Sequence, residues 1–235
     1  MAENVSSPDE VHIVTEDFPP YNYEIDGFKT GLSTEIIQAL LKELNAQAKI
    51  KTLPWPRAYR YALNKKNHLI YSIARIPERE KLFHWVGEIA PYKTSFYKLR
   101  TRTDLQITRL EDAKKFVVGT SLEDVITTFL EKEGFTRLEK VAFDKQNIRL
   151  LLYGRVDLIA YDEVSFVYKV RQEGLSYSDF ERAYRIDALS DVLYVAFSLN
   201  TDEALVNQYR QGLASIRQKG VIEQIQKKYL MGKGN

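Results

Sequence analysis

Residues 11–53 predict a β-α-β unit, and they read VHIVTEDFPPYNYEIDGFKTGLSTEIIQALLKELNAQAKIKTL. Val11 to Thr15 is a short apolar run of the kind that forms strands, and it ends before the turn signal Pro19-Pro20. Ser33 can then cap a helix whose apolar residues follow the helical period; these are Ile36, Ile37, Leu40, Leu41 and Leu44. Lys49 to Leu53 has the pattern of a second strand.

The alternation of strand and helix continues along the chain. Pro54-Trp55-Pro56 marks a break between two elements. A helix is expected from Pro56 to about Leu63, and Leu69 to Ile73 is a strand candidate. The pattern restarts after Arg100. There we expect strands over 116–118, 138–143 and 156–161, and helices over 121–134, 144–154 and 162–174, each of which ends at a glycine.

The last segment is too short for a domain of its own. Asp191 to Ser198 resembles a strand, a helix is expected from Thr201 to Lys219, and a short helix follows up to Tyr229. One strand and two helices cannot bury a separate core, so we expect them to return to the first part of the fold. The fold class is therefore α/β, with parallel sheets covered by helices in two lobes.

The boundaries of these lobes follow from the return of the chain. Lobe 1 is expected to comprise residues 1–95 and 194–235, and lobe 2 residues 96–193. The chain would cross between them near Tyr92 to Arg100 and again near Leu189 to Val195. A pair of crossings is the covalent layout of a hinge.

Composition excludes several classes of function. The chain has 235 residues, 44% of them apolar, which is enough for a substantial core. Its 34 Lys and Arg are interspersed with 32 Asp and Glu, so a nucleic-acid partner is not expected. Without cysteine there is no disulfide and no thiol nucleophile. Phosphate loops, nucleophile elbows and paired metal-binding histidines are absent too, so we expect no cofactor, no metal and no catalytic residue.

Four short motifs together give the sequence a family resemblance. They are EDFPPY (16–21), RIPERE (75–80), GRVD (154–157) with Asp162 beyond it, and KKY (227–229). In this order and spacing, over nearly the whole chain, they resemble the family 3 extracellular solute-binding proteins of bacterial amino-acid uptake. The resemblance implies the two-lobed type II periplasmic binding fold, in which one small ligand is held between the lobes and delivered to a membrane ABC permease.

The same resemblance implies where the protein works. It points to a periplasmic monomer that binds an amino acid or a related zwitterion or organic acid. The sequence contains no run of eighteen apolar residues, so no segment is expected to span a membrane. Residues 1–10 lack the charged and apolar regions of a signal peptide. We therefore expect that an export signal, if the protein has one, has been removed.

Arg79 matches the family's ligand-carboxylate residue. A planar guanidinium can donate two parallel hydrogen bonds to a carboxylate, which an ammonium cannot. Without the resemblance, Arg79 would be one charge at a solvated helix start, beside Glu78, Glu80 and Lys81. The family match favours the binding role.

Two segments of lobe 2 match further family positions. Asp162 corresponds to the Asp that accepts the ligand's ammonium, and Asp157 is expected to be structural. Thr120-Ser121 resembles a Gly-Thr turn that helps to hold the ligand carboxylate at a helix N-terminus. Helix capping is the alternative role for both Asp162 and Thr120-Ser121, and it is compatible with ligand binding.

Aromatic residues are expected to line the pocket. Candidates are Tyr21 or Tyr23 from the first loop, Trp55 from the Pro-Trp-Pro break, and Tyr161 beside Asp162. The alternative for each of them is a place in the core.

The segment before Arg79 departs from the family pattern. The sequence SIARI (72–76) keeps Ser72, but Ala74 replaces a Ser and Ile76 replaces the Thr. Two hydrogen bonds to a carboxylate would then be lost. Arg75 and Arg57 add cations near the expected ligand site, which would suit a second acidic group.

Two other functions stay open from the sequence alone. A sensory module would report its ligand to a signalling protein instead of a transporter. An enzyme on the same fold would resemble the cyclohexadienyl dehydratases, in which a carboxylate does proton work on a bound acid. Binding without chemical change distinguishes a receptor from the enzyme.

Overall fold

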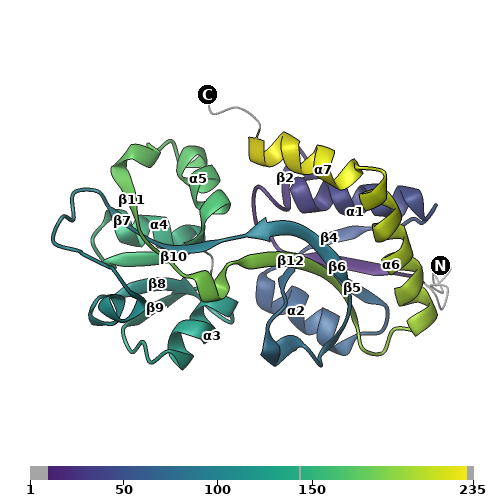
Figure 1. The fold of residues 1–235 in the computed structure, drawn as a ribbon, viewed down its shortest axis with the longest axis horizontal. Coiled ribbons are helices and arrows are strands. Elements are labelled where there is room, and N and C mark those ends of the chain that lie inside the picture. Colours follow the sequence, from purple (N-terminus) through teal and green to yellow (C-terminus); the bar gives the residue numbers. More distant parts are fainter. Residues whose placement is uncertain (1–9, 143, 232–235) are drawn as a thin grey trace, which may run out of the picture. The chain divides into compact units, whose positions relative to one another are not determined.

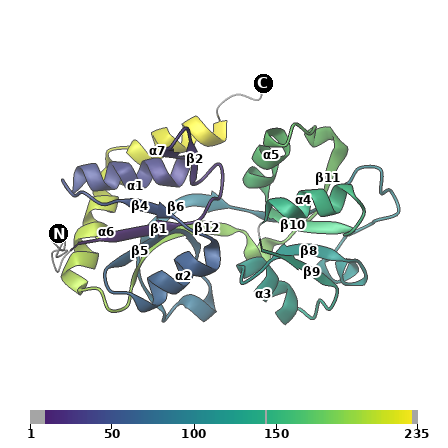
Figure 2. The same cartoon turned by 180° about the vertical axis from the view of Figure 1, so that it is seen from behind.

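The computed structural model describes residues 10–142 and 144–231, and this part of the chain forms two compact units. Unit 1 comprises the described parts of Met1–Ala90 and Leu193–Asn235, and unit 2 those of Pro91–Val192. The chain therefore passes from unit 1 to unit 2 after Ala90 and returns after Val192. Each unit has a five-stranded sheet with helices on both faces, which confirms the α/β prediction (Figures 1 and 2).

The sheet of unit 1 has the strand order β4-β1-β5-β12-β6. Its strands are β1 (His12–Thr15), β4 (Ile50–Thr52), β5 (His68–Ala74), β6 (Phe83–Tyr92) and β12 (Asp191–Ser198). β1 runs parallel to β4 and β5, whereas β12 runs antiparallel to β5. The sheet is therefore mixed, and the expectation of a parallel sheet holds only for its first three strands. A hairpin of β2 (Tyr23–Ile25) and β3 (Phe28–Thr30) stands apart from it.

Helices cover both faces of this sheet. They are α1 (Leu32–Glu43), α2 (Trp55–Asn64), α6 (Glu203–Gln218) and α7 (Val221–Gln226), and a π-helical turn (Lys227–Met231) follows α7. α2 lies on one face, and α1 and α7 lie on the other (Figure 2). α6 packs on α1 closely enough that a Cβ at Gly212 would come within 2.8 Å of the Leu40 side chain. The C-terminal segment does return to the first part of the fold, as predicted.

Helix α1 begins at a backbone cap and not at Ser33. The N–H groups of Leu32 and Ser33 donate to the carbonyls of Pro20 and Tyr21, at 2.9 and 2.8 Å. Ser33 lies inside the first turn, so its expected capping role is wrong. The loop carbonyls accept hydrogen bonds from helix N–H groups that would otherwise need a capping side chain as acceptor.

The sheet of unit 2 has the strand order β11-β7-β10-β8-β9. Its strands are β7 (Thr94–Leu99), β8 (Val118–Ser121), β9 (Leu138–Val141), β10 (Leu158–Asp162) and β11 (Phe180–Arg185). β8 is parallel to β9 and β10, while β7 is antiparallel to β10 and β11. Residues 93–100 were expected only to separate the lobes, but most of them form this interior strand. β6 and β11 were also missed.

The helices of unit 2 begin later than the sequence pattern suggests. They are α3 (Val125–Lys132), α4 (Lys145–Leu152) and α5 (Glu163–Gln172), and short 3-10 turns occur at Leu110–Lys115, Tyr177–Asp179 and Asp187–Leu189. The three predicted stops are confirmed, because Gly134, Gly154 and Gly174 have φ angles of 85°, 64° and 72°. Phe143, the expected end of a strand, lies outside the described residues.

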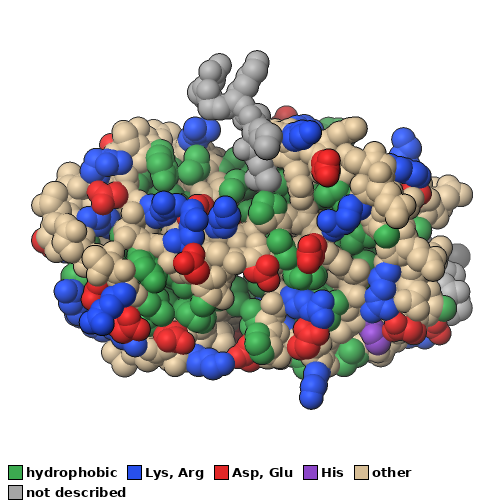
Figure 3. Space-filling model, viewed as in Figure 1, with side chains coloured by type: hydrophobic (Ala, Val, Ile, Leu, Met, Phe, Trp, Pro, Cys, Tyr) green, Lys and Arg blue, Asp and Glu red, His purple; other side chains and the backbone are tan. Residues whose placement is uncertain are grey.

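Lys and Arg are interspersed with Asp and Glu over the face drawn in Figure 3. Nowhere in residues 10–142 and 144–231 is a helix both long and apolar enough to span a bilayer. In the same residues, no group of three His, Asp or Glu side chains could hold a metal ion.

Candidate functional site

The first candidate residues lie at the carboxyl end of β5 in unit 1. Ser72 is buried and has a φ of 59°, a strained value for a residue other than glycine. Its Oγ has no hydrogen-bond partner among the described residues. Ala74 ends the strand, and its carbonyl accepts a hydrogen bond from Nη1 of Arg79 at 3.3 Å. A buried hydroxyl without a partner costs stability, so a ligand that bonded Ser72 would recover it.

Arg79 is buried, and it has no acidic partner among the residues that the structure describes. It ends the 3-10 turn Pro77–Arg79 and is only 6% exposed. Its Cζ lies 5.2 Å from the centre of the Trp55 ring and 4.9 Å from that of Tyr59. In the described residues no carboxylate lies within ion-pair distance of it. Because a buried charge is costly unless it is paired, this guanidinium is suited to an anion from outside the chain.

Arg75 and Arg57 already have partners in unit 1. Arg75 donates two hydrogen bonds to Glu80, at 2.8 and 2.6 Å, and these bonds lower the pKa of Glu80. Arg57 is exposed and donates to the hydroxyl of Tyr61 at 3.0 Å, which lowers the pKa of that phenol. Their roles as ligand contacts stay predictions, and a ligand would have to compete with these bonds.

The three aromatic candidates of unit 1 have different environments. Tyr21 is fully buried, with its ring centre 4.9 Å from that of Phe18. Tyr23 is half-buried at the start of β2. Trp55 opens α2, where its ring stacks on Tyr59 at 5.5 Å and lies beside Arg79. The Trp55 ring is therefore in contact with the predicted ligand residue Arg79.

Asp162 lies at the carboxyl end of β10 in unit 2 and is 2% exposed. Its Oδ1 accepts the N–H of Ser165 at 2.8 Å, so it caps α5 as the alternative reading predicted. Its Oδ2 accepts the N–H of Lys93 at 3.2 Å. Two backbone donors thus hold a buried carboxylate at the end of a sheet strand, where α/β folds commonly place ligands.

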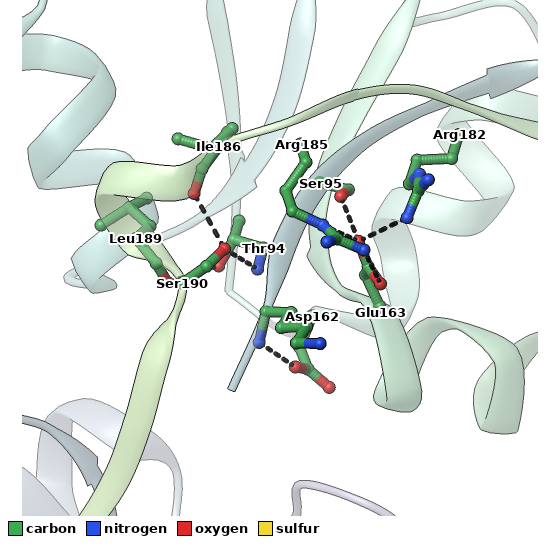
Figure 4. Close-up of polar contacts among 10 residues, drawn as sticks. Thr94, Ser95, Asp162, Glu163, Arg182, Arg185, Ile186, Leu189 and Ser190 are labelled. Carbon is green, nitrogen blue, oxygen red and sulfur yellow. Dashed lines mark hydrogen bonds and ion pairs between the residues drawn. The ribbon is translucent and has the colours of Figure 1, made fainter. Parts of the chain in front are cut away.

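The next residue, Glu163, forms a charged cluster on the same strand end. Its carboxylate accepts bonds from Ser95 at 2.7 Å, from Arg185 at 2.9 and 3.0 Å, and from Arg182 at 3.2 Å (Figure 4). Burial alone would raise the pKa of Glu163, but the hydrogen bonds from Arg185 and Ser95 hold it below its ordinary value. Glu163 therefore stays ionised and ties α5 to β7 and β11.

Thr120 and Ser121 do not form a turn at a helix N-terminus. Both lie in β8, and α3 begins only at Val125, after Asp124. That part of the prediction is wrong, because the chain makes a left-handed turn at Glu123, where φ is 56°. The Oγ1 of Thr120 is nevertheless buried and has no partner among the described residues. Its contact with a ligand stays a prediction.

Tyr161 and Asp157 have structural contacts in unit 2. The Tyr161 side chain is in the hydrophobic core, and its hydroxyl donates to Oδ2 of Asp144 at 2.5 Å. Asp157 accepts the N–H of Val117 and pairs with Arg102, both at 2.9 Å. The structural role expected for Asp157 is confirmed.

Sequence reasoning missed Tyr59 and Glu163. Tyr59 follows Trp55 by four residues on α2, which places the two rings on one helix face. That spacing was visible in the sequence, whereas its approach to Arg79 depends on how two separate elements pack. Glu163 gave no signal, because its partners Ser95 and Arg185 come from distant strands.

Comparisons with known proteins agree with this fold. The family model described as bacterial extracellular solute-binding proteins, family 3, matches residues 11–232. By sequence, none of the curated proteins matches the chain.

Solved structures with the same fold are distant in sequence. A histidine kinase sensor domain similar to periplasmic binding proteins has a TM-score of 0.86 at 18% identity, covering 94% of this chain and 96% of its own. An ancestral arginine-binding protein bound to arginine has a TM-score of 0.81 at 18% identity, covering 94% and 98%. An amino acid ABC transporter substrate-binding protein from Streptococcus pneumoniae, bound to L-arginine, has 0.80 at 16% identity, covering 95% of both chains. At these identities the likeness shows the two-lobed type II fold alone.

Proposed function

Because this chain belongs to the bacterial extracellular solute-binding proteins of family 3, we propose that it captures one small carboxylate-bearing solute, an amino acid or a close relative, for delivery to an ABC importer. The observation that carries the proposal is the buried guanidinium of Arg79, which has no carboxylate partner in the described residues. A ligand carboxylate would supply the missing negative charge and accept two parallel hydrogen bonds.

The other end of the ligand is assigned to Asp162 in unit 2. Asp162 is a buried carboxylate that accepts the N–H groups of Lys93 and Ser165, and its negative charge is the partner that an ammonium group requires. One cation in unit 1 and one anion in unit 2 match the two charges of a zwitterion. Family members hold their ligand between two lobes, and closure on the ligand would be the state that a permease recognises.

A ligand with a single acidic group is favoured over a dicarboxylate. The guanidinium of Arg75 is occupied by Glu80, and that of Arg57 lies on Tyr61. Of these three arginines, only Arg79 lacks an oxygen partner on another side chain of the described part of the chain. A second carboxylate would therefore have to displace an existing contact.

Thermal unfolding against a ligand panel tests this function. The protein is partially unfolded and dialysed to remove carried-over ligand, then heated with amino acids, dicarboxylates, polyamines and small organic acids. A ligand that binds only the native state adds about 2.7 kcal/mol of stability at a hundredfold excess over its Kd. We expect a shift with one class of monocarboxylate, and its recovery chemically unchanged would exclude turnover.

Matched variants assign the site in this assay. Arg79→Ala and Asp162→Ala should each abolish the shift, whereas Arg75→Ala, which removes an arginine already paired with Glu80, should retain it. A shift that survives both Arg79→Ala and Asp162→Ala would show that the ligand binds elsewhere. A panel without any shift would contradict the proposal.

A sensory role is the second candidate function. Its support is the fold shared with a histidine kinase sensor domain at a TM-score of 0.86. Ligand binding is common to both roles, so the gene neighbourhood is the measurement that separates them. Neighbouring permease and ATPase genes would support transport, and a neighbouring kinase gene would support sensing.

A further inference from the structure

We propose that Trp55 and Tyr59 form an aromatic platform that holds the guanidinium of Arg79 in a fixed orientation, with Tyr59 as a positioning residue. The platform is defined here as these two rings. The inference rests on the proposed function only where it assigns a ligand carboxylate to Arg79. Tyr59 then affects affinity through Arg79, without needing to touch the ligand.

The geometry of the three groups supports a platform. The two ring centres lie 5.5 Å apart at an interplanar angle of 28°, so the rings are stacked nearly parallel to each other. The Cζ of Arg79 lies 5.2 Å from one centre and 4.9 Å from the other. Both distances are within the range of a cation–π contact. The guanidinium of Arg79 is therefore in contact with both rings.

A hydrogen bond fixes the remaining freedom of the guanidinium. Nη1 of Arg79 donates to the carbonyl of Ala74 at 3.3 Å, at the end of β5. Stacking restricts tilt, and this bond restricts rotation within the plane. The donors that remain lie along the edge of the group, which is the edge that binds a carboxylate through two bonds.

The platform is itself supported from behind. The ring of Tyr59 lies 5.7 Å from that of Phe83, which is buried in the hydrophobic cluster beneath α2. The spacing of Trp55 and Tyr59 by four residues places both rings on the same face of α2. Helix α2 and the packed core therefore fix the positions of the two rings.

Arg75 provides an internal comparison. Its Cζ lies 5.2 Å from the Trp85 ring centre and 5.5 Å from that of Tyr194, so it too lies on two rings. Its guanidinium donates two hydrogen bonds to the carboxylate of Glu80, at 2.8 and 2.6 Å, and this carboxylate neutralises its charge. The chain thus holds two guanidinium groups on aromatic pairs, and only the one at Arg79 lacks a carboxylate among the described residues. Arg79 is thus oriented by aromatic rings but has no carboxylate partner in the described residues, which fits a binding site for an anion from outside the chain.

Affinity should depend on the platform because arginine has many rotamers. An Arg79 side chain that sampled several rotamers would have to be ordered when ligand binds, and that ordering weakens binding. Cation–π contacts of this kind correspond to about a 2- to 30-fold effect on an equilibrium constant. Loss of the Tyr59 ring should therefore weaken carboxylate binding by a factor in this range.

Nitrogen-15 NMR of the arginine Nε–Hε groups tests the platform without any ligand. Arg79→Lys identifies the Arg79 signal, which should be shifted by the ring currents of Trp55 and Tyr59. In Tyr59→Leu the signal should move toward that of a solvated arginine, and in Tyr59→Phe it should stay in place. Trp55→Leu provides a second ring deletion if Tyr59→Leu fails to fold. An Arg79 signal that is the same in a folded ring deletion and in the wild type would overturn the proposal.

Sodium acetate serves as the carboxylate probe in the same spectra. Titration should perturb the Arg79 signal, with a Kd about 2- to 30-fold weaker in Tyr59→Leu and within about twofold of wild type in Tyr59→Phe. Equal acetate affinities in the wild type and Tyr59→Leu would contradict the positioning role. If acetate left the wild-type Arg79 signal unchanged, the assignment of a ligand carboxylate to Arg79 would fail, while the ligand-free spectra would still decide whether the platform exists.

Discussion

Arg75 and Arg79 lie four residues apart and both rest on aromatic rings, yet their electrostatic states differ. Arg75 shares its charge with Glu80 through two hydrogen bonds, and Arg79 has a carbonyl and two rings as its contacts. Glu80, which follows Arg79 in the sequence, pairs with the exposed Arg75, so the buried Arg79 has no carboxylate partner within residues 10–142 and 144–231. At the residue scale, the distribution of one carboxylate decides which cation can receive a ligand.

The Glu163 cluster gives a pH-dependent prediction at the same scale. Its pKa is held below the ordinary value of 4.5, so the contacts with Arg185 and Ser95 contribute stability that is complete above that value and is lost as the pH falls through the folded pKa. Glu163→Gln should lower the free energy of unfolding by about 1 kcal/mol at neutral pH, because partly exposed pairs contribute little. The deficit should shrink when the pH is lowered well below 4.5, as Glu163 becomes protonated.

Urea unfolding at the two pH values measures this difference. Glu139→Gln, which changes an exposed carboxylate on β9, is the matched control and should cost little at either pH. A deficit for Glu163→Gln that is equally large in acid would show that the ionised carboxylate is not the source of the stability.

At the scale of elements, α1 is built onto the loop that precedes it. Its first N–H groups donate to carbonyls of Pro20 and Tyr21, and this close approach is possible because residue 31 is a glycine. Gly31 has a φ of 112°, and a Cβ there would lie 2.5 Å from the carbonyl oxygen of Tyr21. The loop and the helix therefore depend on each other for their positions.

Gly31→Ala should accordingly be strongly destabilising. Both the backbone strain and the clash with a backbone oxygen oppose the folded state, and we expect a loss of about 3 kcal/mol or more. Gly27→Ala is the matched control, because Gly27 also has a positive φ of 82° but has nothing within 4 Å of the added Cβ. It should lose about 1 kcal/mol from strain alone. Equal losses in chemical denaturation would show that the contact with Tyr21 is not limiting.

At the scale of the whole molecule, the two chain crossings are tied together on the side of unit 2. The N–H of Thr94 donates to Oγ of Ser190 at 3.2 Å (Figure 4). The N–H of Ile186 donates to the carbonyl of Thr94 at 2.9 Å. Lys93, in the first crossing, also donates to Asp162. A ligand bound to Asp162 would therefore contact a residue that is itself hydrogen-bonded to Lys93, in a segment that joins the units.

Ligand binding should change the size of the molecule in solution. If the solute is held by Arg79 in unit 1 and Asp162 in unit 2, saturation should reduce the radius of gyration measured by small-angle X-ray scattering. Asp162→Ala at the same solute concentration should keep the ligand-free value. A wild-type radius that stays constant at saturation would argue against closure.

The sequence predicted the parts of this molecule that depend on local patterns. Strand β1, helix α2 and the stops at Gly134, Gly154 and Gly174 follow from short-range periodicity and backbone freedom. The strand β7 was missed because it is placed by pairing with β10 and β11, and its sequence has no clear alternation. The start of α1 was misjudged for a similar reason, since its cap comes from the backbone of another segment.

The candidate site shows the same division. Arg79 and Asp162 were singled out by the family resemblance; both are buried and Asp162 caps α5, while their roles as ligand contacts stay predictions. Tyr59 required the packing of α2 against the turn at Pro77–Arg79, which no local pattern contains. The turn expected at Thr120-Ser121 failed because a left-handed residue, Glu123, was not foreseen in a chain segment without glycine.

The position of β12 has a consequence for the order in which the protein is made. All five strands of unit 2 lie between Thr94 and Arg185, so that sheet is complete before the chain is finished. The sheet of unit 1 lacks β12, an interior strand between β5 and β6, until residue 198 has been synthesised. During synthesis the earlier strands must therefore wait with two unpaired edges, while the later-made half can already fold. Unit 1 therefore begins synthesis first and is completed last. A chaperone would have more reason to protect unit 1 than unit 2.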